Sequence, residues 1–339
     1  MLIGIIFVVI FLSILILVHE LGHFLFAKKF GLLVEEFGFG LPPKIFSKKI
    51  GETTYSFNAL PFGGFVKIFG EDNLEAGQNR ERSFINLKIW QRAIVLFSGV
   101  LFNFLLGWLA FSIVFAVGLP QAVVITEIKK NSPAQEVGIL AGDKIIDFQK
   151  TDEFIKYINE QQGKNIVLRI ERDGKILNFK TTPRINPPVN EGALGVGLID
   201  VGLQKKNPLA SFWEGLKTSS ELVKAIFMSI TKLIAGVFVG KASLESVTGP
   251  IGIVKITAQA GTLGFAYLIQ LLALISLNLA VINILPFPAL DGGRLFFLAI
   301  EKIKGSSLNP RTEKLANTIG LVFLILLMIA ITIKDIVRL

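Results

Sequence analysis

The stretch His19-Glu20-Leu21-Gly22-His23 lies inside an apolar segment, because residues 1–18 carry no charge and the chain becomes apolar again after His23. Residues i and i+4 share one face of a helix, so these two imidazoles can reach a single metal ion. They are the only histidines in the chain. Ionisable groups inside a membrane span are costly, which makes each one a functional candidate. The alternative is a histidine pair that is merely hydrogen-bonded to backbone carbonyls in a helix bundle.

The composition is that of an integral membrane protein. Of the 339 residues, 52% are hydrophobic and 18% are charged, against about 25% charged residues in typical soluble chains. Cysteine is absent, which excludes disulfides, thiolate zinc sites and cysteine nucleophiles. The net charge of +9 is expected to face lipid headgroups, so the lipid bilayer is an expected partner and nucleic acid is not.

Four uncharged runs are long enough to cross a bilayer, which takes about 20 mostly apolar residues. A cleaved signal peptide is the alternative for the first run, but a basic start and a small-residue cleavage site are missing. The third run is too long for one straight span, so its first part, 256–264, is predicted to be interfacial. The runs are 1–18 with its continuation past His23, 93–126 with Pro120 marking a helix end, 256–290, and 315–333.

Lysine and arginine collect in two loops, which predicts the orientation of the chain. Ten basic residues lie between Lys28 and Arg92, and four more between Arg294 and Arg311. The positive-inside rule places these loops in the cytoplasm. Both termini and the segment from about 120 to 261 are then expected outside.

The outer segment has the pattern of a small mixed domain. Alternation predicts strands at 123–128, 166–170, 176–179 and 192–198, with Asp173-Gly174 as a hairpin turn. Ser132-Pro133 predicts a helix start, and 152–161 suits a short helix with Asp152 as N-cap. Beyond it, apolar residues from Trp213 to Ile234 recur at helical spacing between lysines, which indicates an amphipathic helix at the membrane surface.

A third metal ligand must be a carboxylate, because a catalytic zinc site needs three protein ligands and an open position. Asp291 follows the third span directly, at the same predicted depth as the histidines. Its alternative role is the N-cap of a helix that starts there. Four glutamates after the first span are rivals, but none lies at a span end with turn residues beside it: Glu35, Glu36, Glu52 and Glu71.

Asn283, Pro286 and Pro288 precede Asp291. Prolines break the helix and free backbone groups, which is tolerated at membrane depth only where these groups line protein or water. The broken segment can present Asn283 and backbone donors to an extended substrate. Equally, Asn283 can simply cap the freed carbonyls.

Several motifs are shared with a known family. Together with His-Glu-Leu-Gly-His, they resemble the site-2 protease family of intramembrane zinc metalloproteases, in the bacterial form with a PDZ insertion. The first and last motifs are the specific ones, and the glycine motifs alone are weak. The further motifs are Gly-Phe-Gly at 38–40, Ala-Leu-Pro-Phe-Gly-Gly-Phe-Val-Lys at 59–67, Gly-Val-Leu-Phe-Asn at 99–103, Thr-Gly-Pro-Ile-Gly-Ile at 248–253, and Asn-Ile-Leu-Pro-Phe-Pro-Ala-Leu-Asp-Gly-Gly-Arg at 283–294.

The resemblance implies Zn²⁺ held by His19, His23 and Asp291, with Glu20 as the general base. It also implies an α-helical polytopic membrane protein with about four transmembrane helices, a re-entrant β-hairpin at about 35–70 and one extracytoplasmic PDZ domain. The expected parts are 1–119 with the first two spans, 120–203 as the PDZ domain, 204–260 as amphipathic helix and connector, and 261–339 with spans three and four.

Two substrate-binding regions are also implied by the resemblance. Gly63, Gly64, Phe65 and Val66 would offer a strand edge to an unwound substrate, although the glycines could be ordinary turn residues. The segment 138–145 fits a PDZ turn. A peptide-terminus loop would comprise Gly192, Leu194, Gly195 and Val196.

The expected function is hydrolysis of peptide bonds in transmembrane segments of single-span proteins, trimmed beforehand by another protease. Anti-sigma factors and signal-peptide remnants are the substrates that the family suggests, in the bacterial cytoplasmic (inner) membrane. A non-catalytic metal-binding scaffold with PDZ peptide capture is the alternative. A metal transporter would need further polar groups in spans two and four, where only Asn103 and Asn317 occur.

Overall fold

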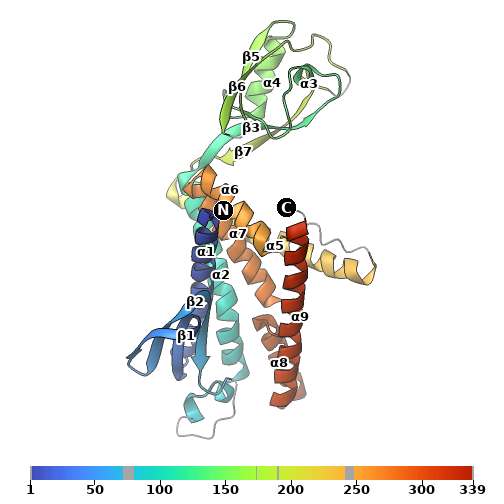
Figure 1. Ribbon diagram of the computed structural model, residues 1–339. Coiled ribbons are helices and arrows are strands. Elements are labelled where there is room, and N and C mark those ends of the chain that lie inside the picture. The colour runs from blue at the N-terminus through green and yellow to red at the C-terminus, as the bar shows by residue number, and fades with distance from the viewer. Residues whose placement is uncertain (1, 72–79, 173, 189–190, 241–247, 338–339) are drawn as a thin grey trace. The chain divides into compact units, whose positions relative to one another are not determined.

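Long apolar helices make up most of the chain in the computed structural model, which describes residues 2–71, 80–172, 174–188, 191–240 and 248–337. The chain divides into two compact units. Residues Phe115–Asn207 form one unit, and the residues before and after them form the other, here called the helical unit. Figure 1 labels the elements of both units.

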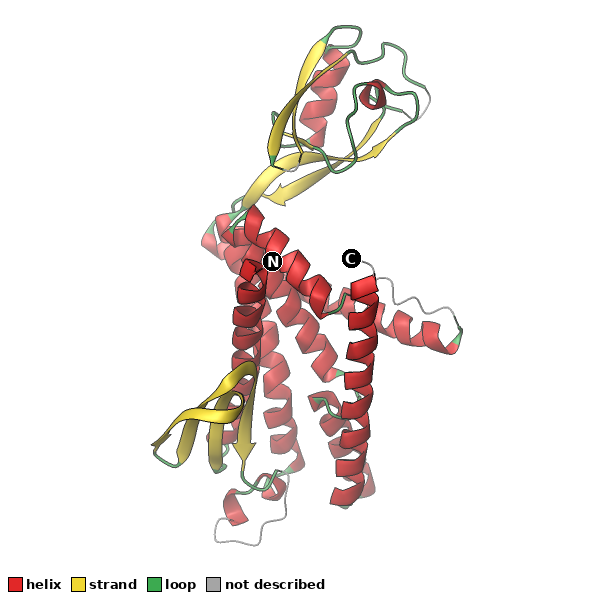
Figure 2. Cartoon of the chain, in the orientation of Figure 1, coloured by secondary structure: helices red, strands yellow, loops and turns green. Residues whose placement is uncertain are grey.

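Four helices of the helical unit are long and apolar enough to cross a membrane. Much of their apolar surface is exposed, as at Leu326, whose side chain is 60% exposed, so these faces need lipid around them. The chain is therefore a polytopic membrane protein that also carries β-sheets (Figure 2). The four helices are α1 (Leu2–Lys29), α2 (Ile89–Val117), α7 (Phe265–Ile284) and α9 (Pro310–Val337).

The ends of two spans differ from the sequence prediction. Helix α2 ends at Val117, and Pro120 lies in the strand that begins at Leu119 rather than at the helix end. Gly118, with a φ of 79°, makes the break. The third apolar run is divided at Gly264, whose φ of 120° favours glycine. The helix before it, α6 (Pro250–Leu263), starts six residues earlier than the predicted interfacial part.

Strands β1 (Val34–Ile50) and β2 (Thr53–Ile68) form a long antiparallel hairpin that folds on itself. The first part of β1 pairs on both sides with β2, since Phe37 lies opposite both Tyr55 and Val66. The end of β2 therefore forms an edge of this sheet, with no second strand partner in the described part of the chain. The hairpin lies beside α1 in Figures 1 and 2.

One buried cluster joins the hairpin to the helices around it. Ala27 of α1, Val34 of β1, Val95 of α2 and Leu298 of α8 (Asp291–Lys304) are all within it. Two ion pairs also hold α8: Arg294 pairs with Glu71, and Arg92 of α2 pairs with Glu301 at 2.8 Å. The helix that begins with Asp291 is thus attached to the first third of the chain. The remaining elements of this unit are η1 (Arg80–Arg82), η2 (Phe84–Asn86) and α5 (Pro208–Phe238).

The second unit is a five-stranded antiparallel sheet in the order β6-β5-β4-β3-β7, with two short helices. Its core includes Val123, Ile125, Phe154 and Ile170. The β5–β6 pair is the predicted hairpin. The elements are β3 (Leu119–Ile128), α3 (Pro133–Glu136), β4 (Lys144–Ile145), α4 (Thr151–Glu160), β5 (Ile166–Arg172), β6 (Lys175–Thr181) and β7 (Val196–Leu203).

Of three local predictions in this unit, one is confirmed and two are wrong. Ser132 is an N-cap as expected, since its hydroxyl accepts a hydrogen bond from the Gln135 amide. Asp152 is not the N-cap of α4; the Asp200 carboxylate of β7 accepts from the Thr151 amide instead. The last strand begins at Val196 rather than at residue 192. Asp173 lies outside the described residues.

Replacing Arg92 by Leu leaves the Glu301 carboxylate buried without its cation. Loss of one partner of a buried pair costs about 3–5 kcal/mol, so we expect a clear fall in the thermal unfolding midpoint in detergent. Arg82→Leu is the control, because Arg82 pairs with Glu52 at the surface and such pairs contribute about 1 kcal/mol or less. Equal losses for the two variants would contradict this role of the Arg92–Glu301 pair.

The stability of the second unit should depend on pH through Asp143. Burial raises the pKa of this carboxyl. Hydrogen bonds from Arg172 and from the Leu140 amide lower the pKa by more than burial raises it, so the net shift is downward. A lowered pKa stabilises the fold above the unfolded value of about 3.9 and loses that contribution as the pH falls below it.

The Asp143→Asn variant should therefore be less stable than the wild type at pH 7, and the difference should shrink below about pH 4. Hydrogen exchange of the β3 and β5 amides, corrected for intrinsic rates, measures this. A difference that stays constant with pH would count against it.

Candidate metal centre

Three side chains from two distant parts of the chain meet at one point. His19 Nε2 lies 3.1 Å from Asp291 Oδ2, His23 Nε2 lies 3.5 Å from the same oxygen, and the two Nε2 atoms are 3.2 Å apart. Of the described residues, these alone form a group of three or more that could hold a metal ion. The histidines come from one face of α1, and Asp291 comes from the first turn of α8.

The geometry and the donor set of this triangle fit zinc. Bonds of about 2.0–2.1 Å in a tetrahedral site place two ligand atoms roughly 3.3 Å apart. The three observed edges, 3.1, 3.2 and 3.5 Å, lie around that value. Asp291 Oδ2 is buried without a hydrogen-bond donor, as expected of an oxygen that faces a cation. Two imidazoles and one carboxylate leave the fourth position open.

Asp291 does not cap its helix. Leu290 occupies the N-cap position of α8, and Asp291 is the first helical residue. Its carboxylate is directed toward the two imidazoles. The alternative assignment as an N-cap is therefore wrong.

The four rival glutamates are each paired with a cation elsewhere. Glu35 binds Lys67 and Glu36 binds Lys44, both at 2.6 Å. Glu52 accepts from Lys28 and Arg82, and Glu71 pairs with Arg294. None of them belongs to the metal-ligand group found in the described residues.

Residues of α2 contact the Nδ1 side of both imidazoles. His23 Nδ1 lies 2.8 Å from the Val95 carbonyl, and His19 Nδ1 lies 3.3 Å from Asn103 Nδ2. Gly99 lies between these two positions, and a Cβ there would clash with both histidine rings. Sequence reasoning singled out the Gly-Val-Leu-Phe-Asn motif but gave Asn103 no role. Val95, Gly99 and Asn103 are spaced four residues apart, as are His19 and His23. This shared spacing is the sequence pattern that could have indicated a contact between the two helices.

Glu20 lies beside the edge of the hairpin. A Cβ added at Gly64 would come within 3.3 Å of Glu20 Cγ and 3.0 Å of Ile16 Cγ2. Gly64, Phe65 and Val66 are in the sheet, opposite Phe39, Gly38 and Phe37. Gly63 has a φ of 110°, so it makes the bend that leads into this edge.

The segment before Asp291 is non-helical. Helix α7 ends at Ile284, one residue after Asn283, and Pro286 and Pro288 lie in the irregular stretch before α8. Helix α9 holds this stretch, because Asn317 Oδ1 accepts from the Ala289 amide at 3.0 Å. A Cβ at Gly320 would clash with the Pro288 carbonyl.

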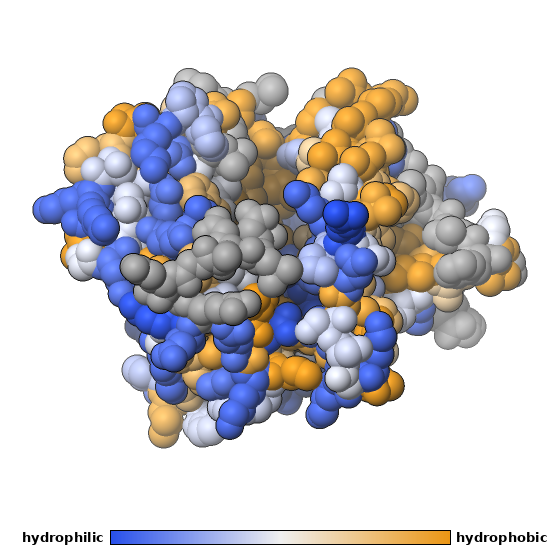
Figure 3. Space-filling view, turned by 90° about the horizontal axis from the view of Figure 1, so that it is seen from below, coloured by the Kyte–Doolittle hydropathy of each residue, from blue (hydrophilic) through white to orange (hydrophobic). Residues whose placement is uncertain are grey.

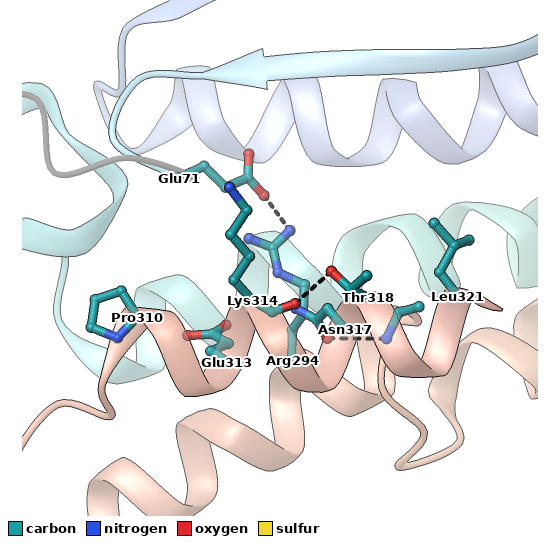
Figure 4. Close-up of a pocket in the computed structure, with 9 residues that line it drawn as sticks. Glu71, Arg294, Pro310, Glu313, Lys314, Asn317, Thr318 and Leu321 are labelled. Carbon is teal, nitrogen blue, oxygen red and sulfur yellow. Dashed lines mark hydrogen bonds and ion pairs between the residues drawn. The ribbon is translucent and has the colours of Figure 1, made fainter. Parts of the chain in front are cut away.

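A polar pocket of about 530 Å³ adjoins the turn that carries Asp291. Ala289 and Arg294 line it, but Asp291 does not. Figure 4 shows the Glu71–Arg294 pair and the Asn317 side chain in its wall. The other lining residues come from α9: Pro310, Glu313, Lys314, Thr318 and Leu321.

The predicted peptide-terminus loop belongs to the second unit. Gly192, Leu194 and Gly195 precede β7, and Val196 is its first residue. The Gly195 amide donates to the Gly192 carbonyl, while the carbonyls of Leu194 and Gly195 accept from the amides of Ala134 and Lys129. The side chain of Leu194 is buried in the core of the unit.

Comparisons with known proteins place the chain in a family. The model of peptidase family M50 matches residues 7–327. A Clostridium perfringens protein named as a zinc metalloprotease is 38% identical over 98% of both chains. A Fusobacterium nucleatum protein named in the same way is 33% identical over 98% of both.

The regulator of sigma-W protease RasP of Bacillus subtilis is 30% identical over 98% of both chains. That alignment extends over 421 residues, more than the 339 of this chain, so RasP contains additional residues. The match to the family nevertheless covers nearly the whole chain. The chain therefore belongs to peptidase family M50, the site-2 protease family, and is a zinc metalloprotease.

Proposed function

We propose that this protein is an intramembrane endopeptidase that hydrolyses peptide bonds in the transmembrane segments of single-span proteins. His19, His23 and Asp291 hold the zinc ion. The observation that carries the proposal is the triangle of ligand atoms, which joins a helix long enough to span a membrane to the first turn of α8. A site within a span is accessible to a substrate that is itself in the bilayer.

A zinc ion held by His19, His23 and Asp291 would supply Lewis-acid activation of the scissile carbonyl and of the attacking water. Glu20, the residue that follows the ligand His19 on α1, removes the proton from the attacking water. The same carboxyl then returns the proton to the leaving amine. A helical substrate must unwind first, because its amides are engaged in internal hydrogen bonds.

The end of β2 is the proposed receptor for the unwound substrate. Gly64, Phe65 and Val66 form a sheet edge beside Glu20, and an extended peptide gains backbone hydrogen bonds by adding to such an edge. Gly63, whose φ is 110°, directly precedes this edge. Asn283, in the last turn of α7, and the irregular stretch with Pro286 and Pro288 would support the substrate from the side of Asp291.

The proposed topology places the basic loops in the cytoplasm and both termini outside. Hydrophilic residues gather on the end of the helical unit that Figure 3 shows, with apolar residues on its flanks. The β1–β2 hairpin, which has exposed Ile45 and Phe46 beside its lysines, would enter the membrane from that side as a re-entrant element. Helix α5, with exposed Trp213 and Phe227, would lie at the opposite membrane surface.

The unit Phe115–Asn207 is proposed to be a single PDZ domain outside the membrane. Strand β7 is an edge of its sheet, which suits peptide capture by strand addition beside Gly192, Leu194, Gly195 and Val196. The proposed substrates are pre-cleaved single-span proteins, including membrane-bound anti-sigma factors and signal-peptide remnants. The name of RasP, a regulator of sigma-W protease, supports a regulatory substrate of this kind.

Glu20→Gln should retain zinc and lose cleavage by at least 100-fold, because general-base catalysis contributes about 10²–10⁴-fold while Glu20 is not a ligand. Metal analysis and cleavage of a single-span protein in detergent, with and without a chelator, measure both properties. Glu35→Gln, which removes only a pair with Lys67, is the control. Wild-type cleavage by Glu20→Gln would contradict its role, and a wild type that binds zinc but forms no product would indicate a scaffold.

Asp291→Asn should weaken zinc binding, since the neutral amide lacks the negative charge of the carboxylate that it replaces. Dialysis against graded chelator, followed by metal analysis, gives the change in affinity. The matched control is Asp147→Asn, at the surface of the second unit. Unchanged zinc retention in Asp291→Asn would exclude Asp291 as a ligand.

A further inference from the structure

Asn103 of α2 has no role in the reaction as described so far, yet its amide is directed at a metal ligand. Its side chain is 1% exposed. Asn103 Nδ2 lies 3.3 Å from His19 Nδ1, and Asn103 Oδ1 is buried without a hydrogen-bond partner. Asn103 is also fixed from the other side, because Ser276 of α7 donates to its backbone carbonyl at 2.7 Å.

A neutral imidazole carries its proton on only one nitrogen, and a metal ligand must keep the other free. His19 and His23 both direct Nε2 toward Asp291, so each needs its proton on Nδ1. For His23 this is satisfied, because Nδ1 faces the Val95 carbonyl, which can only accept. His19 Nδ1 needs an acceptor of the same kind.

The amide nitrogen cannot be that acceptor. If Asn103 Nδ2 donated to His19 Nδ1, the ring proton would be on Nε2 and would occupy the position needed by the ion. The two ends of an amide are nearly equal in size, so a half-turn of the side chain exchanges them. The oxygen, now without a partner, then faces Nδ1.

We propose that Asn103 is the positioning residue that fixes the tautomer of His19: its Oδ1 accepts a hydrogen bond from Nδ1–H and leaves Nε2 free for zinc. Val95 does the same for His23 through its carbonyl. Three α2 positions spaced four residues apart thus serve both ligands, with Gly99 providing the room between them. The proposal depends on the assignment of His19 as a zinc ligand through Nε2.

The test measures zinc affinity by competition with a chelator for three variants of the full-length protein. Asn103→Leu has no acceptor and should bind zinc 10–100-fold more weakly, the usual effect of removing a partner of a ligating histidine. Asn103→Asp can only accept, so it should bind at least ten-fold more tightly than Asn103→Leu. Asn278→Leu, an exposed position of α7, is the matched control and should retain wild-type affinity.

Rescue by Asp separates positioning from packing, because a packing defect would not be corrected by a buried charge. Asn103→Leu with unchanged affinity, or Asn103→Asp that binds more weakly than Asn103→Leu, would overturn the proposal. The second outcome would mean that the amide donates. A His19→Ala variant measured in parallel separates the role of Asn103 from the assignment of His19 as a zinc ligand. If His19→Ala retains wild-type zinc affinity, the ligand assignment itself fails.

Discussion

The rest of this structure depends on one constraint. Two imidazoles and a carboxylate must be held close together inside a membrane protein. A carboxylate oxygen that is buried without a donor, as Asp291 Oδ2 is, is costly in a medium of low dielectric constant. A divalent cation removes this cost, but only if the three ligand atoms stay at the corners of a triangle about 3 Å on a side. The surrounding fold must therefore fix two helices far apart in sequence to within a fraction of an ångström.

Close packing supplies part of this precision. Gly99 lets α2 approach the two rings, and Gly22 lets α1 approach the Ser98 carbonyl, so the imidazoles lie directly against backbone. On the other side, the Arg92–Glu301 and Arg294–Glu71 pairs connect α8 to the first third of the chain. Since Asp291 begins that helix, ion pairs at both its start and its later turns limit how far the carboxylate can move.

The same environment brings together the elements that a peptide hydrolase needs. The irregular stretch before Asp291 is accommodated because α9 supplies Asn317 and the space at Gly320. The edge of β2 lies close to Glu20 at Gly64, where an added Cβ would come within 3.3 Å of Glu20 Cγ. The proposed substrate edge, the proposed base and the metal ligands thus adjoin one another around α1, and each contact depends on a small residue or a polar side chain that faces inward.

Much of this could be predicted from the sequence, because local physics determines it. Long uncharged runs require spans, and the i, i+4 spacing of His19 and His23 requires a shared helix face. The β5–β6 hairpin, the Ser132 cap and the break before Asp291 follow from turn chemistry. One local signal failed because a distant residue replaced it: the Asp200 carboxylate accepts from the first amide of α4 in place of Asp152. Another failed because a nearer residue preceded it: Gly118 ends α2 before Pro120. The sequence favoured Asp291 over four rival glutamates only by its predicted depth and neighbouring turn residues. The tertiary structure showed its contact with both imidazoles and placed Asn103 behind His19. Those outcomes depend on which helices pack together, and residues separated by 84 or more positions leave no periodicity in the chain to reveal it.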